Sequence, residues 1–233
     1  MSAPVALLTA LHKVLPLAKL RVTDVPLLAT NQPFALWLID DNFCHQDLTP
    51  AVIERLWSHC PYWVFAWASG QVLARHILTA PQTVAGKVVL DFGAGSGIVG
   101  IAAKRAGARR VICCDVDPIS LLACQANAAL NGETITLLDD LHALASVGVD
   151  KVDVLCMADV LYDAANVAWL DTALDVADTV WLADSWLKNL AHPRYQRVAT
   201  VEQTTTLPDM DEARQFNRVT LYQRTSLLQT PEN

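Results

Sequence analysis

The residues best suited to chemistry in this chain follow one apolar run. Val88 to Leu90 leads into Asp91, and three glycines then stand at alternate positions, Gly93, Gly95 and Gly97. Glycine has no side chain and accepts positive φ, so such a turn lets a ligand approach bare backbone. The following residues, 98–106, favour a helix, whose first N–H groups are unpaired and suit an electronegative part of a ligand. The stretch therefore predicts a strand, a glycine turn and a helix start that bind a nucleoside-containing cofactor.

Two cofactors are compatible with this turn. Residues 95–100, Gly-Ser-Gly-Ile-Val-Gly, satisfy the dinucleotide pattern G-x-G-x-x-G. Counted from Asp91, the stretch is Asp-x-Gly-x-Gly-x-Gly, which resembles the first motif of class I S-adenosylmethionine-dependent methyltransferases. A carboxylate at Asp91 can organise the ammonium of S-adenosylmethionine, whereas it would repel a pyrophosphate. Asp91 therefore favours S-adenosylmethionine.

Further acids stand after the next two expected strands. Asp115 lies 22 residues after Gly93, where an acid hydrogen-bonds both ribose hydroxyls in either class of cofactor. Asp139 and Asp140 follow the third strand, where class I methyltransferases commonly place an acid near the adenine amino group. We take Asp140 as the candidate, although both acids could equally be solvated turn residues. The neighbours expected to contact the cofactor as well are Ala94, Val116 and Leu141.

The elements expected around these residues alternate. Strands are predicted over 88–91, 110–115, 134–139, 152–157 and 179–183, and helices over 98–106, 118–130 and 167–177. This alternation, with nearly continuous apolar strands, predicts a parallel sheet covered on both faces. Two runs rich in Val, Thr and Tyr, 195–206 and 217–224, predict a closing antiparallel hairpin. The expected fold is α/β, with a Rossmann-like, seven-stranded, mostly parallel sheet. The hairpin resembles the end of the seven-stranded methyltransferase sheet, whose last strand is antiparallel. A dehydrogenase would normally also have a second, substrate-binding domain, for which too little chain is left.

The first 80 residues predict an extension that packs on this core and contributes to the cofactor site. Helices are expected over 5–15, over 50–58 with Thr49 as N-cap, and over 71–79, and a strand is expected over 34–39. The predicted division is 1–80 for the extension, 81–225 for the methyltransferase core and 226–233 for a loose tail.

Composition excludes several classes of function. The net charge of −7 argues against a nucleic-acid partner, which needs a basic face. No apolar stretch reaches about 18 residues, so we expect no membrane-spanning helix. Six cysteines without a secretory signal are expected to be reduced, in the cytoplasm. Cys44-His45 and His59-Cys60 fit no common zinc spacing, so no metal is predicted.

Four local patterns point to a narrower group. They are the aromatic run 62–71 (Tyr-Trp-Val-Phe-Ala-Trp-Ala-Ser-Gly-Gln), the Asp91 glycine motif, residues 125–132 (Gln-Ala-Asn-Ala-Ala-Leu-Asn-Gly) and residues 158–163 (Ala-Asp-Val-Leu-Tyr-Asp). Over roughly residues 34–223 the chain resembles bacterial relatives of the electron-transfer-flavoprotein β-subunit lysine methyltransferase, a group also labelled predicted nicotinamide N-methylases. The residues alone allow the aromatic run to be either core or ligand wall. The resemblance implies that Trp67, Gly70 and Gln71 help to bind the cofactor, whose sulfonium is favoured over aromatic faces.

The same resemblance implies a catalytic motif, acid-x-x-aromatic, at Asp159 and Tyr162. Methylation of an amine is an in-line displacement that depends on positioning and desolvation. A carboxylate can hold the amine through its N–H groups and stabilise the positive charge that grows on nitrogen. We assign this role to Asp159, which also contacts the cofactor, with Tyr162 as a second contact. The alternative is that Asp159 merely caps the next helix.

One segment departs from the group. After the fifth strand the group usually shows Gly-Asp-Pro-Gly-Arg, whereas residues 183–187 are Ala-Asp-Ser-Trp-Leu. This segment lies near the substrate mouth in such folds, so the acceptor stays open. The expected function is protein-lysine N-methylation. The alternatives are methylation of a small-molecule amine or nicotinamide-type nitrogen, and a non-catalytic protein that binds the cofactor and a partner.

Overall fold

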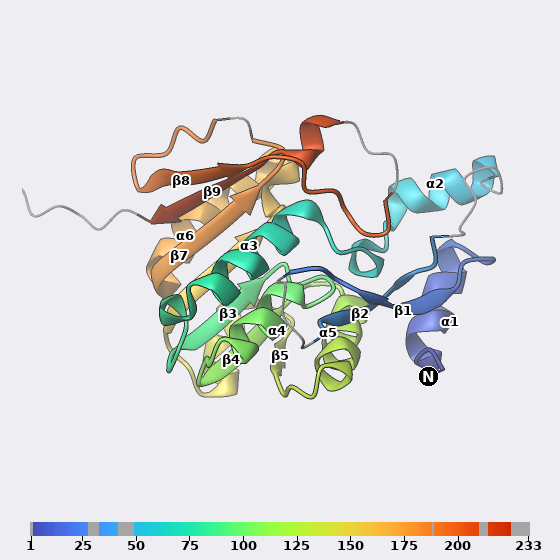
Figure 1. Ribbon diagram of the computed structural model, residues 1–233, viewed down its shortest axis with the longest axis horizontal. Coiled ribbons are helices and arrows are strands. Elements are labelled where there is room, and N and C mark those ends of the chain that lie inside the picture. The colour runs from blue at the N-terminus through green and yellow to red at the C-terminus, as the bar shows by residue number, and fades with distance from the viewer. Residues whose placement is uncertain (1, 28–32, 42–48, 188, 210–213, 225–233) are drawn as a thin grey trace, which may run out of the picture.

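The computed structural model describes residues 2–27, 33–41, 49–187, 189–209 and 214–224, and it contains two β-sheets (Figure 1). The larger sheet has seven strands in the order β5-β4-β3-β6-β7-β9-β8. These strands are β3 (Val88–Phe92), β4 (Arg110–Cys114), β5 (Thr136–Leu138), β6 (Val152–Ala158), β7 (Ala177–Asp184), β8 (Tyr195–Val201) and β9 (Val219–Arg224). The first five strands in spatial order are parallel, β9 pairs antiparallel with β7, and β8 pairs antiparallel with β9. The predicted mostly parallel sheet with a closing hairpin is confirmed.

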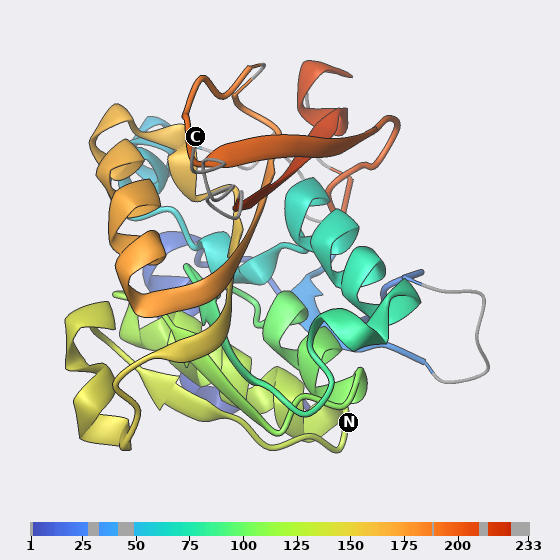
Figure 2. The same cartoon turned by 90° about the vertical axis from the view of Figure 1, so that its left-hand side faces the viewer.

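Helices cover both faces of this sheet, because successive residues of each strand point to opposite faces. Val89 packs under α3 (Ala68–Thr79), α4 (Ile98–Arg105) and α5 (Pro118–Leu130). Its neighbour Leu90 packs on the other face with α6 (Trp169–Val176) and a 3-10 segment, Leu141–Val147. Figure 2 shows α3 and α6 on opposite sides of the strands.

The N-terminal elements form a third apolar cluster beside α5. They are α1 (Val5–Val14), β1 (Leu20–Asp24), β2 (Ala35–Ile39), α2 (Pro50–Ser58) and a 3-10 turn, Tyr62–Val64. Two amide side chains, from α5 and from the residue that follows it, hold β2: Asn127 Oδ1 accepts from the Trp37 N–H at 2.7 Å, and Asn131 Nδ2 donates to the Ala35 carbonyl at 2.7 Å. Figure 1 shows the β1–β2 ribbon next to α5. The proposed boundary at residue 80 stays a prediction, and α3, which precedes it, packs on the large sheet.

Local signals placed most boundaries well. Thr49 caps α2 as expected, and Asp117 caps α5. Three elements differ from the expectation. Strand β1 was not expected, and all five of its residues pair with β2, a contact between segments that a local pattern does not reveal. Helix α3 begins at Ala68 rather than residue 71, and Gly70 in its first turn lies close to Ile98 of α4. Helix α6 begins later than predicted because 3-10 turns occupy residues 160–168.

The described residues contain neither a membrane-spanning helix nor a cluster of metal ligands. The helices within these residues are all too short or too polar to cross a membrane. Groups of three or more metal-ligating side chains also do not occur among the described residues. Cys44 and His45, and the tail 226–233, lie outside the described residues.

Candidate functional site

The carboxyl ends of three adjacent strands border one cavity of about 1050 Å³. In the sheet, Phe92 at the end of β3 pairs with Cys114 of β4 on one side and Met157 of β6 on the other. The strand order reverses at this point, and such a switch point opens a crevice in α/β sheets. Asp91, Asp115 and Asp159, which are distant in sequence, therefore all border the same cavity.

The glycine turn has the backbone that the sequence predicted. Gly93, Gly95 and Gly97 have φ of 69°, 52° and 77°, a region that other residues rarely adopt. A Cβ on Gly93 would also lie 2.6 Å from Cγ1 of Val160, so a side chain could not be accommodated there. Gly93, Ala94 and Gly95 line the cavity. Gly97 is not among the lining residues, because a Cβ there would meet Cys124 of α5, and its contact with the cofactor stays a prediction.

Asp91 holds the turn against the next helix. Its side chain is 2 % exposed, and Oδ2 accepts from the Gly100 N–H at 2.8 Å. Burial raises the pKa of Asp91 to about 7, which the Gly100 hydrogen bond partly opposes and the nearby Asp115 reinforces. The carboxyl thus borders the cavity and anchors α4 at once. The anchoring role was not expected from the sequence.

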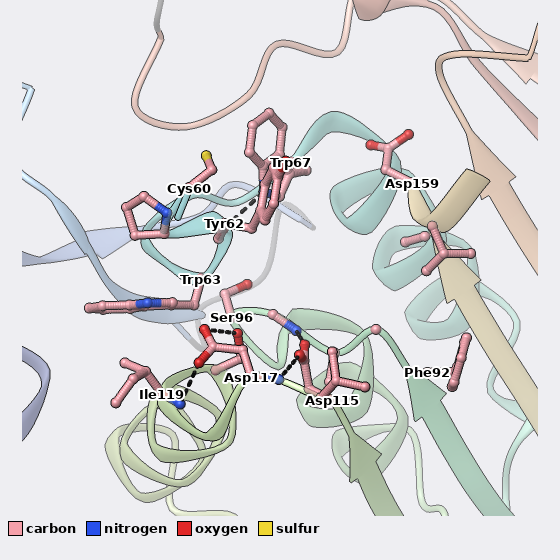
Figure 3. A pocket seen from close by; sticks show the side chains of 18 of the residues that line it. Cys60, Tyr62, Trp63, Trp67, Phe92, Ser96, Asp115, Asp117, Ile119 and Asp159 are labelled. Carbon is pink, nitrogen blue, oxygen red and sulfur yellow. Dashed lines mark hydrogen bonds between the residues drawn. The ribbon is translucent and has the colours of Figure 1, made fainter. Parts of the chain in front are cut away.

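Asp115 accepts one backbone hydrogen bond on each oxygen. The Gly95 N–H donates to Oδ2 at 2.8 Å and the Asp117 N–H to Oδ1 at 2.9 Å (Figure 3). Burial raises the pKa of Asp115, and both N–H groups oppose that rise. Each oxygen keeps a second lone pair, so the fixed carboxylate can accept from two hydroxyls. Val116, next in the chain, is 86 % exposed at the cavity rim.

Asp139, Asp140 and Leu141 all border the cavity beyond β5. Asp140 Oδ1 also accepts from the His142 N–H at 2.9 Å and so caps the 3-10 segment that follows. Asp139 has no such hydrogen bond among the described residues. The geometry therefore does not select between the two acids, and the assignment of Asp140 to the adenine stays a prediction.

The aromatic run contributes both to the core and to the cavity. Trp67 and Gly70 line the cavity, while Val64 and Ala66 are fully buried. The Trp67 ring is held by a hydrogen bond from Nε1 to the Tyr62 carbonyl at 2.9 Å. Trp63, another residue of the aromatic run, also lines the cavity, and Figure 3 shows it facing Ile119.

Gln71 does not border the cavity. It is 3 % exposed, and its Nε2 donates to the carbonyls of Ala66 at 2.7 Å and Thr205 at 2.8 Å. The bond to Thr205 joins the start of α3 to the segment after β8. Both bonds use Nε2, and the contact between Gln71 and the cofactor stays a prediction.

Asp159 lies on the same rim as Trp67, across the cavity from Asp115 (Figure 3). Its Oδ1 accepts three hydrogen bonds: from Ser69 Oγ at 2.7 Å, Ser185 Oγ at 2.8 Å and Ser185 N–H at 2.9 Å. Burial raises the pKa of Asp159, and the two serines oppose the rise. Asp159 makes no side-chain cap to the 3-10 turn that follows, so the alternative of a capping residue is not supported.

Three half-exposed aromatic side chains line the cavity where it meets the surface. Tyr62, Tyr162 and Trp186 are 44 %, 49 % and 51 % exposed, and the Tyr62 and Tyr162 rings lie 5.6 Å apart between centroids. Burial, with smaller contributions from Cys60 and Tyr162, raises the pKa of Tyr62 to about 12, so its hydroxyl stays protonated at neutral pH. Ser69, Ser185 and Trp186 were not predicted as site residues. The one signal for the last two was the departure at residues 183–187.

Asn127 explains the pattern at residues 125–132. Its side chain is fully buried, and its Nδ2 donates to the Ser96 carbonyl of the glycine turn at 2.8 Å while Oδ1 accepts from Trp37. One amide therefore joins the N-terminal sheet, α5 and the glycine turn.

Comparisons with known proteins agree with this geometry. Residues 77–172 match the family described as ribosomal protein L11 methyltransferase. The human electron transfer flavoprotein beta subunit lysine methyltransferase is 37 % identical over 135 residues, which are 57 % of this chain and 46 % of that protein. The chain thus spans about half the length of that relative. The Caenorhabditis elegans homolog is 30 % identical over 193 residues, which are 70 % of this chain and 74 % of that protein.

Solved structures show the same fold at low identity. A 16S rRNA methyltransferase of T. thermophilus has a TM-score of 0.56 at 16 % identity, covering 89 % of this chain and 51 % of that one. The magnesium protoporphyrin IX methyltransferase of Synechocystis has a TM-score of 0.50 at 21 % identity, covering 68 % and 80 %. The sequence relatives name the family more narrowly: this chain belongs to the electron transfer flavoprotein beta subunit lysine methyltransferase family.

Proposed function

We propose that this protein is an S-adenosylmethionine-dependent N-methyltransferase that methylates lysine in a protein. The observation that carries the proposal is that one cavity joins a nucleoside site to a candidate catalytic acid. The glycine turn and Asp115 border it on one side, and Asp159 borders it on the other. A binding protein would need the first side alone.

The residues present fit S-adenosylmethionine. Asp115 offers a free lone pair on each oxygen to the two ribose hydroxyls. Asp91 would favour the ammonium of the amino-acid part, and Trp67 presents an aromatic face of the kind that favours a sulfonium. The bare backbone of the turn from Gly93 to Gly95 allows close approach. When bound, this cofactor supplies an electrophilic methyl group.

The chain's own task is to bring a neutral amine into line with that methyl group. Asp159 accepts an N–H of the amine, which orients the nitrogen lone pair and stabilises the positive charge that develops on nitrogen during transfer. The surrounding aromatic side chains exclude water, which strengthens the interaction between the carboxylate and the developing ammonium. Tyr162 lies at the rim, where it can contact the stem of the acceptor.

A protein acceptor is favoured by the shape of the entrance. The cavity meets the surface at Tyr62, Tyr162 and Trp186, each about half exposed, instead of being closed over. A lysine side chain carries four methylene groups that pack against aromatic rings, with the amine at the far end. The sequence relatives are named for methylation of proteins. A small-molecule acceptor would be better served by a closed chamber.

The proposal also includes a non-RNA acceptor, which rests on net charge, and a cytoplasmic location, which rests on the cysteines. The net charge of −7 disfavours an RNA acceptor, and likeness to an rRNA methyltransferase at 16 % identity speaks for the fold alone. The described cysteines are all free thiols, which suits the reducing cytoplasm.

The test is transfer from labelled S-adenosylmethionine to the proteins of a cell lysate, followed by mass spectrometry of labelled bands. We expect label on lysine of one or a few proteins. Label in small molecules alone would replace the protein acceptor by the small-molecule alternative.

Calorimetry with S-adenosylmethionine and with a nicotinamide dinucleotide separates the cofactors, and binding of the dinucleotide alone would overturn the proposal.

A further inference from the structure

Three hydrogen bonds from two serines converge on a single oxygen of Asp159. Ser69 belongs to the first turn of α3 and is fully buried, and Ser185 follows the last residue of β7. Asp159 itself follows β6. The three residues are separated by 90 and 26 positions in the chain, so the arrangement joins three separate elements.

We propose that Ser69 and Ser185 are positioning residues that clamp Oδ1 of Asp159 and thereby present Oδ2 to the acceptor amine. The inference rests on the proposed function, and it adds to that function the residues that orient the carboxylate. All three of these hydrogen bonds use Oδ1, and Oδ2 is the oxygen that the proposal assigns to an N–H of the substrate.

The backbone of Asp159 is held in an unusual conformation. Its φ is 51°, in the left-handed region, where a residue with a Cβ is strained. Such a conformation persists where the surrounding structure holds it, as it does at many functional sites. Donors on rigid elements fix the side chain in one orientation before the substrate arrives, so the ordering is not left to the reaction step.

Among the described residues, the ionised form of Asp159 is favoured by the two serines and not by a neighbouring positive charge. After burial, which raises its pKa, the largest effects are four hydrogen-bonding contributions, from the hydroxyl and backbone N–H of Ser69 and of Ser185, and all of them lower it. Asp184, 1 % exposed, is an ionisable neighbour, and its pKa is about 6, raised chiefly by burial and further by Asp159. Asp184 adds repulsion, so the serine donors are what favours the ionised form of Asp159.

Ser185 stands at the position of the proline in the Gly-Asp-Pro-Gly-Arg pattern that the group named in the sequence analysis usually shows. Proline has neither a backbone N–H nor a hydroxyl, so it could supply none of the bonds that Ser185 makes. Two of the three hydrogen bonds on Oδ1 therefore depend on this chain's own departure at residues 183–187.

The first experiment titrates the Asp159 carboxyl by ¹³C NMR, with Asp159→Asn to assign its signal. Loss of a hydrogen bond to a carboxylate is expected to raise its pKa by about one unit in Ser69→Ala and in Ser185→Ala. Ser185→Thr keeps both donors and should restore the wild-type titration. Thr79→Val is the matched control, because that hydroxyl lies in the same helix as Ser69 and bonds carbonyls of its own helix alone.

The second experiment measures methyl transfer with the same variants. We expect kcat to fall about tenfold or more in each alanine variant, because a misplaced catalytic group is costly, while KM for S-adenosylmethionine stays within a few-fold. An unchanged titration and an unchanged kcat in a folded Ser185→Ala protein overturn the clamp. This variant also decides the question if Ser69→Ala does not fold, since Ser185 is only partly buried. A wild-type chain that transfers no methyl group overturns the proposed function instead, and the titration still decides whether the serines hold Asp159.

Discussion

At the scale of single residues, the three carboxylates of the cavity differ in what surrounds them. Asp115 is fixed by two backbone N–H groups, Asp159 by two serines, and Asp91 by the single N–H of Gly100. Burial raises the pKa of each, and Asp91, which is the least compensated, reaches about 7. The three carboxylates therefore have different surroundings for the three roles proposed for them. Asp115 would bind the ribose hydroxyls, Asp159 the acceptor amine and Asp91 the ammonium of the cofactor.

Asp159→Asn should separate chemistry from binding. Asparagine keeps the size of the side chain, but it removes the charge that stabilises the developing ammonium. We expect kcat to fall by about 10²-fold or more, the range seen when one preorganised electrostatic contact is lost. Affinity for S-adenosylmethionine should stay within a few-fold by calorimetry. Retained turnover would move the catalytic role to another residue.

Asp91 predicts a pH dependence of cofactor binding. In the free protein its pKa is about 7, and a bound ammonium would favour the ionised form, so binding releases a proton below that pH. Affinity should therefore rise between pH 5.5 and 7, by up to about tenfold per unit, and level off near 7. Calorimetry at pH 6 in two buffers of different ionisation enthalpy measures the released proton. Asp91→Asn should abolish the release, and a wild-type affinity that is flat over this range would contradict the ammonium contact.

At the scale of elements, the site depends on joints between segments. Gln71 joins α3 to the segment after β8, and Asn127 joins α5 to β2 and to the glycine turn. Gly70 allows α3 and α4 to approach, because a Cβ there would lie 2.9 Å from a methyl carbon of Ile98. Each of these contacts holds at least one element that borders the cavity.

Asn127→Ala tests the most buried of these joints. The substitution leaves the Trp37 N–H and the Ser96 carbonyl without partners in a buried place. Each such loss costs about 1–3 kcal/mol, so we expect the free energy of unfolding to fall by about 2–4 kcal/mol in urea denaturation. Gln125→Ala, on the exposed face of the same helix, is the control and should change it by less than about 0.5 kcal/mol. Equal effects of the two variants would contradict the proposed joint.

At the scale of the whole molecule, the cavity lies between the N-terminal elements and the large sheet. Tyr62, Trp63 and Trp67 come from the segment before and at the start of α3, whereas Asp115 and Asp159 come from β-strand ends. A ligand in this cavity would contact both parts at once. Its binding should therefore stabilise the fold as a unit.

Thermal unfolding measures this effect. A ligand at about 100 times its Kd adds about 2.7 kcal/mol to the folded state. For a chain of 233 residues this corresponds to a rise in Tm of about 5–10 °C. We expect that rise with S-adenosylmethionine in differential scanning calorimetry and no rise with a nicotinamide dinucleotide at equal concentration. The reverse order would argue for the dinucleotide interpretation of the glycine turn.

Sequence patterns predicted the features that depend on neighbours in the chain. The positive φ of the glycine turn, the Thr49 cap and the alternation of strands and helices all follow from residues a few positions apart. The choice of S-adenosylmethionine also came from such a local feature, the acid placed two residues before Gly93.

Contacts between distant segments could not be predicted in this way. The pairing of β1 with β2, the turn of Gln71 toward Thr205, and the meeting of Ser69 and Ser185 on Asp159 join residues far apart in the chain. A serine or glutamine has the same local preferences whether its side chain meets a ligand, a carbonyl or water. Which of these it meets is decided when the sheet brings strand ends together, because packing and the burial of polar groups select the partner.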